Sequence, residues 1–232
     1  MKDAIENALK YLDRFQYKIH SGKDLNQRMI DDLFEKVSPY RLELRPGDKD
    51  EVLLIVDDTG KSTGLHAPRW LCHLAGLRHR VAEILLSWDS TQSGSMYLLQ
   101  MRSWTKSDSP GHIDISVGGH VKGTRIDNVT ENAYAEMEEE LGFIAEDLCD
   151  NALMECCSYA HYDSVPAANF YNSEWRIIYN GTIKNDHLKN VRFKDGEVVG
   201  LYLCPVNEAQ HLLNQTGLPL GSALVHTLPK LL

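Results

Sequence analysis

Residues 118–143 read GGHVKGTRIDNVTENAYAEMEEELGF, and the rest of the chain is organised around this stretch. Glu136, Glu139 and Glu140 stand at positions i, i+3 and i+4, which places their carboxylates within roughly one third of a helix circumference. Like charges at this spacing destabilise a helix unless a cation lies between them, and a divalent cation that prefers oxygen ligands fits this need. The alternative is an acidic helix face that only water surrounds.

The surrounding sequence favours the metal interpretation. Residues 127–150 contain nine acidic side chains and no lysine or arginine, so no neighbour in the sequence neutralises the carboxylates. Asn128 with Glu131 predicts a capping box at the start of the helix, and Gly142 predicts its end. An apolar stripe adjoins the carboxylate face and predicts that this face borders the protein body; it consists of Val129, Ala133, Met137 and Leu141.

Residues 136–143, EMEEELGF, resemble the second half of the Nudix hydrolase signature at every fixed position. That signature is G-x5-E-x7-R-E-U-x-E-E-x-G-U, in which U is a bulky apolar residue. The first half departs from it, because Ala135 replaces the arginine, Asp127 replaces the earlier glutamate, and the spacing from Gly119 to Asp127 is two residues too long. In the family these two residues brace the loop and helix, so the resemblance implies a rebuilt brace. From the residues alone, Asp127 is a helix-terminus residue that the helix dipole favours.

Four further segments resemble the branch of this family that contains isopentenyl-diphosphate isomerase and its hydrolase relatives. They are residues 53–64, 77–80 (LRHR), 98–103 (LLQMRS) and 110–120 (PGHIDISVGGH). His79 matches a metal-binding histidine of the isomerases, although a strand histidine is more often a half-buried, hydrogen-bonded residue. Gly118 stands where the isomerases have their catalytic cysteine. The C-terminal third resembles the branch only loosely, through Glu174 and Glu197.

The resemblance implies a set of site residues. Glu136, Glu139 and Glu140 would bind Mg²⁺ or Mn²⁺, one of them would serve as the base, and the Gly119 carbonyl would add a backbone ligand, which hard cations accept. Basic side chains in the neighbouring segments would grip phosphate oxygens; they are Arg78, Arg80, Arg102 and Lys106. Each of these four taken alone is more often a surface charge.

Charge and cysteine content restrict the classes of function. The net charge of the 232 residues is −9, and residues 1–48 contain nine basic and nine acidic side chains, so the excess falls on residues 49–232. An acidic body argues against a nucleic-acid scaffold, since phosphate binding needs a positive surface. The five cysteines show no spacing of a zinc site or a disulfide framework. With no apolar run long enough to span a bilayer, the sequence predicts a cytoplasmic protein that does not enter a membrane.

The hydrophobic pattern predicts an N-terminal helical hairpin followed by a catalytic domain. Helical periodicity runs from Ile5 to Ile19, breaks at residues 21–23, and resumes after Asp24 as the expected N-cap. The hairpin, residues 1–48, would either cover the domain of residues 49–232 or form the interface of a homodimer. Strands are expected at residues 52–56, 80–88, 96–101, 113–117, 153–161, 174–183 and 198–204, and further helices at 68–75, 207–214 and 223–232.

This order of elements predicts an α+β fold, a Nudix-type α/β/α sandwich with a mixed sheet. The leading functional prediction is a Mg²⁺-dependent hydrolase of a nucleoside diphosphate derivative or a similar small diphosphate substrate. The isomerase reaction is a second possibility. A third is a catalytically decayed Nudix domain that acts as a ligand-binding or regulatory module, which the replaced arginine and the longer loop favour.

Overall fold

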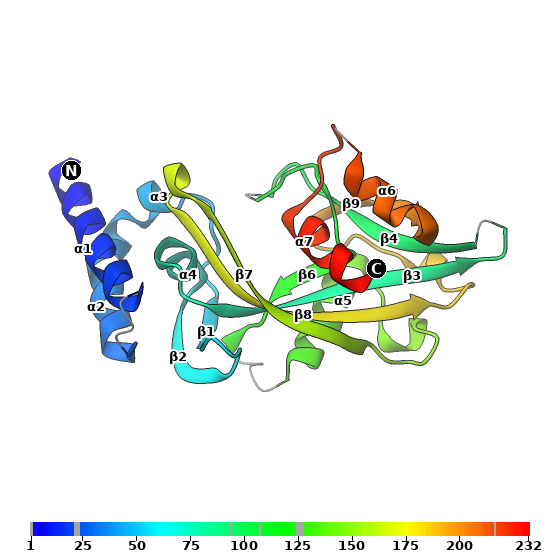
Figure 1. The fold of residues 1–232 in the computed structure, drawn as a ribbon, viewed down its shortest axis with the longest axis horizontal. Helices are drawn as coiled ribbons and strands as arrows, with labels where there is room; N and C mark the ends of the chain where they lie inside the picture. The colour runs from blue at the N-terminus through cyan, green and yellow to red at the C-terminus, as the bar shows by residue number, and fades with distance from the viewer. Residues whose placement is uncertain (1, 21–23, 93, 107, 124–127, 216) are drawn as a thin grey trace. The chain divides into compact units, whose positions relative to one another are not determined.

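The computed structural model describes residues 2–20, 24–92, 94–106, 108–123, 128–215 and 217–232 (Figure 1). The chain forms two units, each assembled from three separate stretches of sequence. Unit 1 takes residues 1–80, 121–126 and 159–175, and unit 2 takes residues 81–120, 127–158 and 176–232. Three strands, β3 (His79–Ser90), β7 (Met154–Val165) and β8 (Phe170–Ile183), continue along the chain from one unit into the other.

Unit 1 contains the predicted helical hairpin, formed by α1 (Lys2–His20) and α2 (Gln27–Val37). The N-cap of α2 is Asn26, whose side chain accepts a hydrogen bond from the Met29 amide at 3.2 Å, so the expectation of Asp24 as the cap is wrong. Asn26 caps the helix in place of Asp24 because it is the residue directly before the helix. From there its side chain reaches an amide of the first turn that has no carbonyl partner within the helix. The predicted break at residues 21–23 lies outside the described residues.

The hairpin shares one hydrophobic core with the strands and the helix that follow it in unit 1. These are α3 (Arg41–Leu44), β1 (Val52–Val56), β2 (Ser62–Pro68) and α4 (Arg69–Ala75). The side chains at the centre of this core are fully buried and come from the first stretch of the unit, residues 1–80; they include Leu12, Leu33, Leu53, Trp70 and Leu74. Each large apolar side chain that is fully buried stabilises the folded state by about 1.5–3 kcal/mol. The hairpin is therefore a structural part of unit 1.

Strand β2 was not predicted. It pairs antiparallel with β1, with Val52 opposite Pro68 and Leu54 opposite His66, while β1 also pairs with the start of β3 through Ile55 and His79. Most of β2 is exposed, so it lacks the alternation of apolar and polar residues by which a half-buried strand is predicted.

Unit 2 is built on an antiparallel sheet in which β4 (Gly94–Arg102) pairs with three strands, namely β3, β5 (Ile113–Asp114) and β9 (Val198–Pro205). Strand β6 (Val117–His120) pairs with β3, and β8 pairs with both β3 and β7. The single strand expected at residues 113–117 is therefore two short strands with different partners, β5 on β4 and β6 on β3. The break falls at Ile115 and Ser116, where the Ser116 hydroxyl accepts a hydrogen bond from the Leu86 amide at 2.8 Å.

Helices of unit 2 cover both faces of this sheet. Ala82 and Glu83 are neighbours on β3, so their side chains point to opposite faces. Gly119, the partner of Ala82, faces helix α5 (Val129–Leu141), whereas Glu83 accepts a hydrogen bond from Thr227 of helix α7 (Ser222–Leu231). Helix α6 (Ala209–Asn214) shares a core cluster with α7.

This arrangement confirms the predicted α+β fold with helices on both faces of the sheet, but the strand pairs whose register is described are antiparallel where a mixed sheet was expected. Short 3₁₀ helices lie at Ser38–Tyr40, Ala145–Asp147, Pro166–Ala168, Leu188–Asn190 and Val206–Glu208. Among the helices that the structure describes, not one is both long and apolar enough to cross a bilayer.

Candidate metal centre

Helix α5 begins and ends where its sequence signals predict. Asn128 is the N-cap, and its side chain accepts a hydrogen bond from the Glu131 amide at 3.0 Å while donating one to the Glu131 carboxylate at 3.1 Å. Gly142 ends the helix at a φ of 76°, a left-handed conformation that glycine adopts without strain. The predicted capping box is thus present in a modified form, in which the Glu131 carboxylate accepts its hydrogen bond from the side chain of Asn128 and not from its backbone amide. Asp127 lies outside the described residues.

The helix presents its glutamates to different environments. Glu140 is buried with 1% of its surface exposed, Glu136 is half-buried, and Glu139 is exposed. Glu138 is exposed as well, its carboxylate is 3.4 Å from the Lys194 ammonium, and it borders the same small hollow as Glu139 and Asp195. The apolar stripe that was expected to adjoin the carboxylates is buried, with Ala133, Met137 and Leu141 fully inaccessible. The carboxylate face therefore borders the protein body, as predicted.

Glu136 lies directly against the backbone of Gly119. A Cβ atom built on Gly119 would lie 2.3 Å from Cδ and 2.4 Å from Oε2 of Glu136, closer than non-bonded atoms can approach. Only glycine at position 119 therefore lets this carboxylate approach strand β6. Two members of the predicted ligand set, Glu136 and Gly119, are thus brought together by the fold.

Two acidic residues from a distant loop join the buried end of this face. Carboxylate oxygens of Glu140, Asp195 and Glu197 lie within 4.8 Å of one another. Asp195 and Glu197 belong to the turn before β9, in which the Glu197 amide donates to the Asp195 carboxylate at 2.8 Å and Gly196 has a φ of 75°. Asp195 was not among the predicted site residues, and Glu197 was named only for the loose resemblance of the C-terminal third to the isomerase branch. The sequence Asp-Gly-Glu directly before a predicted strand is the signal that could have indicated these two carboxylates.

Electrostatics at this cluster favour a bound cation. Burial raises the pKa of Glu140 to about 8; the charge of Lys106 opposes this increase, and the charges of Glu136, Glu197 and Asp195 add to it. Glu140 is therefore mostly protonated at neutral pH in the metal-free protein. A divalent cation would release this proton when it binds, because a carboxylate ligand must be ionised.

Lys106 and Arg102, two of the expected phosphate ligands, have different surroundings. The Lys106 ammonium forms an ion pair with Glu197, so the fold brings it to the acidic cluster. Arg102 is buried, its Nη2 donates to the Asp108 carbonyl at 2.9 Å, and its Nη1 lies 3.7 Å from the Asp114 carboxylate. The guanidinium of Arg102 thus holds the loop that follows β4.

Arg78 and Arg80, the other two expected phosphate ligands, belong to unit 1. The Arg78 guanidinium pairs with the Asp58 carboxylate and donates to the Ser173 hydroxyl at 3.2 Å. It lines a cleft of about 860 Å³ within unit 1 that Tyr171 also borders. Arg80 donates to the Gly60 carbonyl at 2.8 Å. Both arginines therefore contact the turn that joins β1 to β2.

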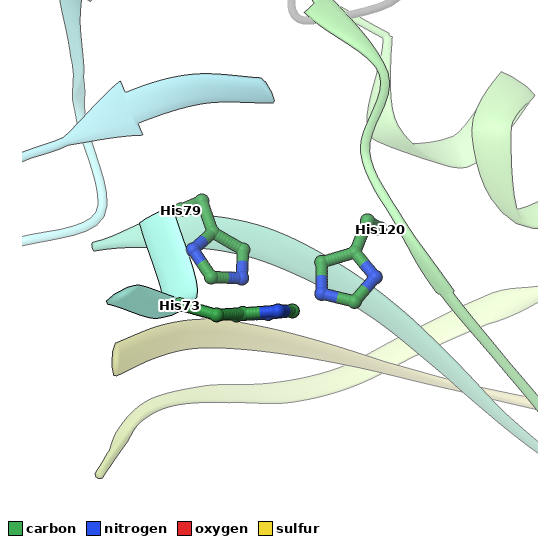
Figure 2. A group of neighbouring side chains, drawn as sticks. All are labelled: His73, His79 and His120. Atoms are coloured by element: carbon green, nitrogen blue, oxygen red, sulfur yellow. The ribbon is translucent and has the colours of Figure 1, made fainter. Parts of the chain in front are cut away.

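Two histidines of unit 1 have the hydrogen bonding that is typical of metal ligands. His79 donates from Nδ1 to the Leu77 carbonyl at 2.9 Å, and Nδ1 of His73 lies 2.8 Å from the Asp48 carboxylate. Their ring centroids are 5.3 Å apart, and Figure 2 shows the two rings beside each other. Burial, followed by the nearby charge of His73, lowers the pKa of His79 to about 4, so its imidazole is neutral. A neutral ring whose Nδ1 is fixed by a carbonyl offers Nε2 as a ligand atom.

Asp48 explains why His73 is held so firmly. Burial alone would raise the pKa of the Asp48 carboxyl, but His73 hydrogen-bonds to it, and the charges of His73 and Arg69 together with a bond from Arg45 lower the pKa well below its usual value. An ionised carboxylate behind the ring fixes the tautomer of His73. His73 was not among the predicted residues, because its pairing with Asp48 joins positions 25 apart in the chain.

Comparison with known proteins relates the chain to one group of enzymes. No protein-family profile matches it. Over 166 residues it is 29% identical to Nudix hydrolase 3 of Arabidopsis thaliana, an alignment that covers 69% of this chain and 20% of that protein. The chain thus spans about a fifth of the length of this curated relative. The crystal structure of DR0079 from Deinococcus radiodurans superposes with a TM-score of 0.56 and 21% identity, covering 78% of this chain and 98% of that one, and this likeness establishes the fold.

Proposed function

We propose that this chain is a member of the Nudix hydrolase family and hydrolyses a small diphosphate compound such as a nucleoside diphosphate derivative, with Mg²⁺ or Mn²⁺ held by the carboxylates of helix α5. The observation that carries the proposal is the contact between Glu136 and Gly119. It draws one carboxylate of the acidic face against a strand backbone, where a cation can take oxygen ligands from both.

The residues present fit a divalent cation. The proposed donors are oxygen atoms of Glu136, Glu139 and Glu140, although the carboxylates that lie within 4.8 Å of one another in the structure are those of Glu140, Asp195 and Glu197. A Cβ at position 119 would occupy the space of the Glu136 carboxylate. When bound, the cation supplies charge neutralisation at the phosphate oxygens and lowers the pKa of bound water. The chain itself orients these carboxylates by the caps of α5 and by burial of its apolar stripe.

Basic side chains in each unit are proposed to bind phosphate oxygens. Lys106 lies at the carboxylate cluster and supports a contact with a phosphate oxygen. Arg78 pairs with Asp58, whose side chain is 96% exposed, and such exposed ion pairs contribute only about 0–1 kcal/mol. Arg78 can therefore exchange this partner for a phosphate at little cost. Arg80, which contacts the turn after β1 in unit 1, and Arg102, which holds the loop after β4 in unit 2, remain proposed phosphate ligands.

A ligand-binding or regulatory module is the second candidate function. The specific observation in its favour is Ala135, which stands where the family signature has an arginine. In this case the acidic face would bind a cation and a diphosphate compound without cleaving it. The isomerase reaction is not proposed, because Gly118 has no group that could transfer a proton.

We also propose a cytoplasmic location and small-molecule substrates. Free thiols at Cys72, Cys149, Cys156, Cys157 and Cys204 are what a reducing compartment maintains. The division into a hairpin extension, residues 1–48, and a catalytic domain, residues 49–232, remains our proposal, as does a homodimer formed through the hairpin.

A panel of diphosphate compounds, assayed with and without Mg²⁺, tests the proposed function. Hydrolysis of at least one compound should depend on Mg²⁺ and fall by roughly 10²-fold or more in Glu139→Gln, as expected for loss of a principal electrostatic contact. Glu138→Gln is the matched control, because Glu138 pairs with Lys194 and is not one of the proposed metal ligands. Binding of a diphosphate without cleavage would favour the module instead. Equal losses in the two variants would refute the assignment of the carboxylate face.

A further inference from the structure

Trp104, in the loop between β4 and β5, exposes a large apolar surface. Its side chain is 78% exposed, whereas tryptophan side chains bury most of their area on average. A solitary exposed apolar side chain needs no functional explanation by itself. The way in which the chain holds this ring is therefore the decisive observation.

Gly111 supports one face of the Trp104 ring. A Cβ atom built on Gly111 would lie 2.5 Å from Cη2, 2.5 Å from Cζ3 and 2.8 Å from Cε3 of the ring. These three atoms are consecutive in the six-membered ring, and a point almost equally distant from all of them lies over the face of the ring, not at its edge. Gly111 also has a φ of 71°, a conformation that favours glycine. The ring therefore lies flat against a glycine backbone and turns its other face to solvent.

The turn that contains Trp104 is attached to the acidic cluster. The Lys106 amide donates to the Ser103 carbonyl at 3.2 Å, which closes a β-turn with Trp104 at its tip. Both ends of this turn contact Glu197, because the Ser103 amide donates to the Glu197 carbonyl at 2.8 Å and the Lys106 ammonium pairs with the Glu197 carboxylate. A β-turn is less than about 7 Å across. The exposed ring and Lys106, a proposed phosphate ligand, thus belong to one anchored turn.

Arg102 holds the remainder of the loop from within. Its amide donates to the His112 carbonyl at 2.9 Å, and its Nη2 donates to the Asp108 carbonyl at 2.9 Å. A ring that is already fixed in one orientation loses little conformational entropy when a ligand stacks on it. Exposed aromatic rings of this kind bind nucleic-acid bases, since every base has a flat π face.

We propose that Trp104 stacks on the base of a nucleotide whose phosphate end lies at Lys106, so that it is a specificity-determining residue of the proposed hydrolase. The inference rests on the proposed function, because that function places the phosphate groups of the substrate at the acidic cluster. It narrows the substrate to diphosphates that carry an aromatic base. An aliphatic diphosphate offers no flat surface to the ring.

Equilibrium binding of AMP in the presence of Mg²⁺ tests the inference, since AMP has no diphosphate linkage to be cleaved. Ribose 5-phosphate is the matched ligand without a base, and the wild type should bind AMP roughly tenfold more tightly than this sugar phosphate, as expected for one stacked base. Trp104→Ala should remove this preference for AMP. Trp104→Phe should keep most of the preference and lose the quenching of tryptophan fluorescence that AMP causes in the wild type.

Two further variants sharpen this test. Gly111→Ala keeps the tryptophan but removes the space on which the ring lies, so it should also weaken AMP binding. Tyr17→Ala is the matched control, because Tyr17 is an equally exposed aromatic residue, 75% exposed, on helix α1 of the other unit. It should bind AMP as the wild type does. Circular dichroism confirms that each variant is folded.

Equal affinities of the wild type for AMP and ribose 5-phosphate would overturn the inference, and so would unchanged AMP binding in Trp104→Ala. A dimer in sedimentation experiments that Trp104→Ala dissociates would assign the ring to a subunit contact instead. These outcomes are separable from failure of the proposed function. If the AMP results are as expected and no diphosphate is cleaved, the stacking site stands and the hydrolase proposal fails. If ADP is cleaved with the same KM by the wild type and by Trp104→Ala, only the present inference fails.

Discussion

Replacing Glu140 by glutamine should stabilise the metal-free protein in alkaline solution. Burial raises the pKa of this carboxyl from its usual 4.5 to about 8, so between these values the folded chain keeps a proton that the unfolded chain has released. The free energy of unfolding therefore falls as pH rises through this window, by about 1.4 kcal/mol per pH unit. Below pH 4.5 both states are protonated, and this cost is absent.

The Glu140→Gln side chain has nearly the same shape and never ionises, so the cost should disappear in the variant. The full window corresponds to a ceiling on the order of 5 kcal/mol, and water that reaches the site reduces it, so we expect about 2–4 kcal/mol at pH 8.5. For a chain of this size that is a rise in Tm of roughly 5–15 °C. At pH 4.5 the two proteins should melt within about 2 °C of each other.

Thermal unfolding in the presence of EDTA, at pH values from 4.5 to 9, measures this difference. Excess Mg²⁺ should reverse the order at pH 8.5, because the wild type gains binding energy that the variant has lost. Glu138→Gln, which changes an exposed carboxylate of the same helix that pairs with Lys194, is the control and should follow the wild-type curve at every pH. Parallel pH curves for Glu140→Gln and the wild type would refute the electrostatic argument.

Four further outcomes are expected. Gly119→Ala should lower Mg²⁺-dependent hydrolysis tenfold or more with the circular dichroism spectrum unchanged, since a Cβ there would lie 2.3 Å from Cδ of Glu136 and must displace it. Ala135→Arg should change the turnover rate by less than about tenfold, or about 1.4 kcal/mol of barrier; a gain of several orders of magnitude would show that the natural enzyme is crippled. Asn128→Ala should lower the free energy of unfolding in urea by about 1 kcal/mol through loss of the N-cap, and an unchanged midpoint would contradict the capping geometry. With Gly118 in place of a proton donor, a label-exchange assay should detect no interconversion of isopentenyl and dimethylallyl diphosphate.

The part of the site on helix α5 could be predicted because its signals are local. Asn128 and Gly142 set the two ends of the helix from the positions that adjoin them. The period of the apolar stripe sets which face is buried, and it repeats within each turn. The same spacing rule predicted that Glu138 points away from the other carboxylates, yet Glu138 borders one hollow with Glu139 and Asp195 because Lys194, its ion-pair partner, precedes Asp195 in the turn before β9.

The rest of the site depends on contacts between distant parts of the chain. Glu140 meets Asp195 and Glu197 only because the turn before β9 returns to the end of helix α5, and Lys106 joins them from a fourth position. Neither the hydrophobic period nor a motif within one segment predicts a contact with a distant segment. For the same reason the split of residues 113–117 into two strands was missed, since their partners, β4 and β3, decide it.

The division of each unit among three stretches of chain has a consequence for biosynthesis. The first 80 residues leave the ribosome early, yet unit 1 also needs residues 159–175, which are made after most of the sheet of unit 2. Pairings over such long sequence separations must close large loops before they contribute stability, and this slows folding. The core cluster of the hairpin, which includes Leu12 and Leu33, comes from residues 8–77 and can pack early, whereas the pairing of β3 with β8 must wait for residues 170–183. A nascent chain halted near residue 150 should therefore expose the buried residues of β3 to chaperones.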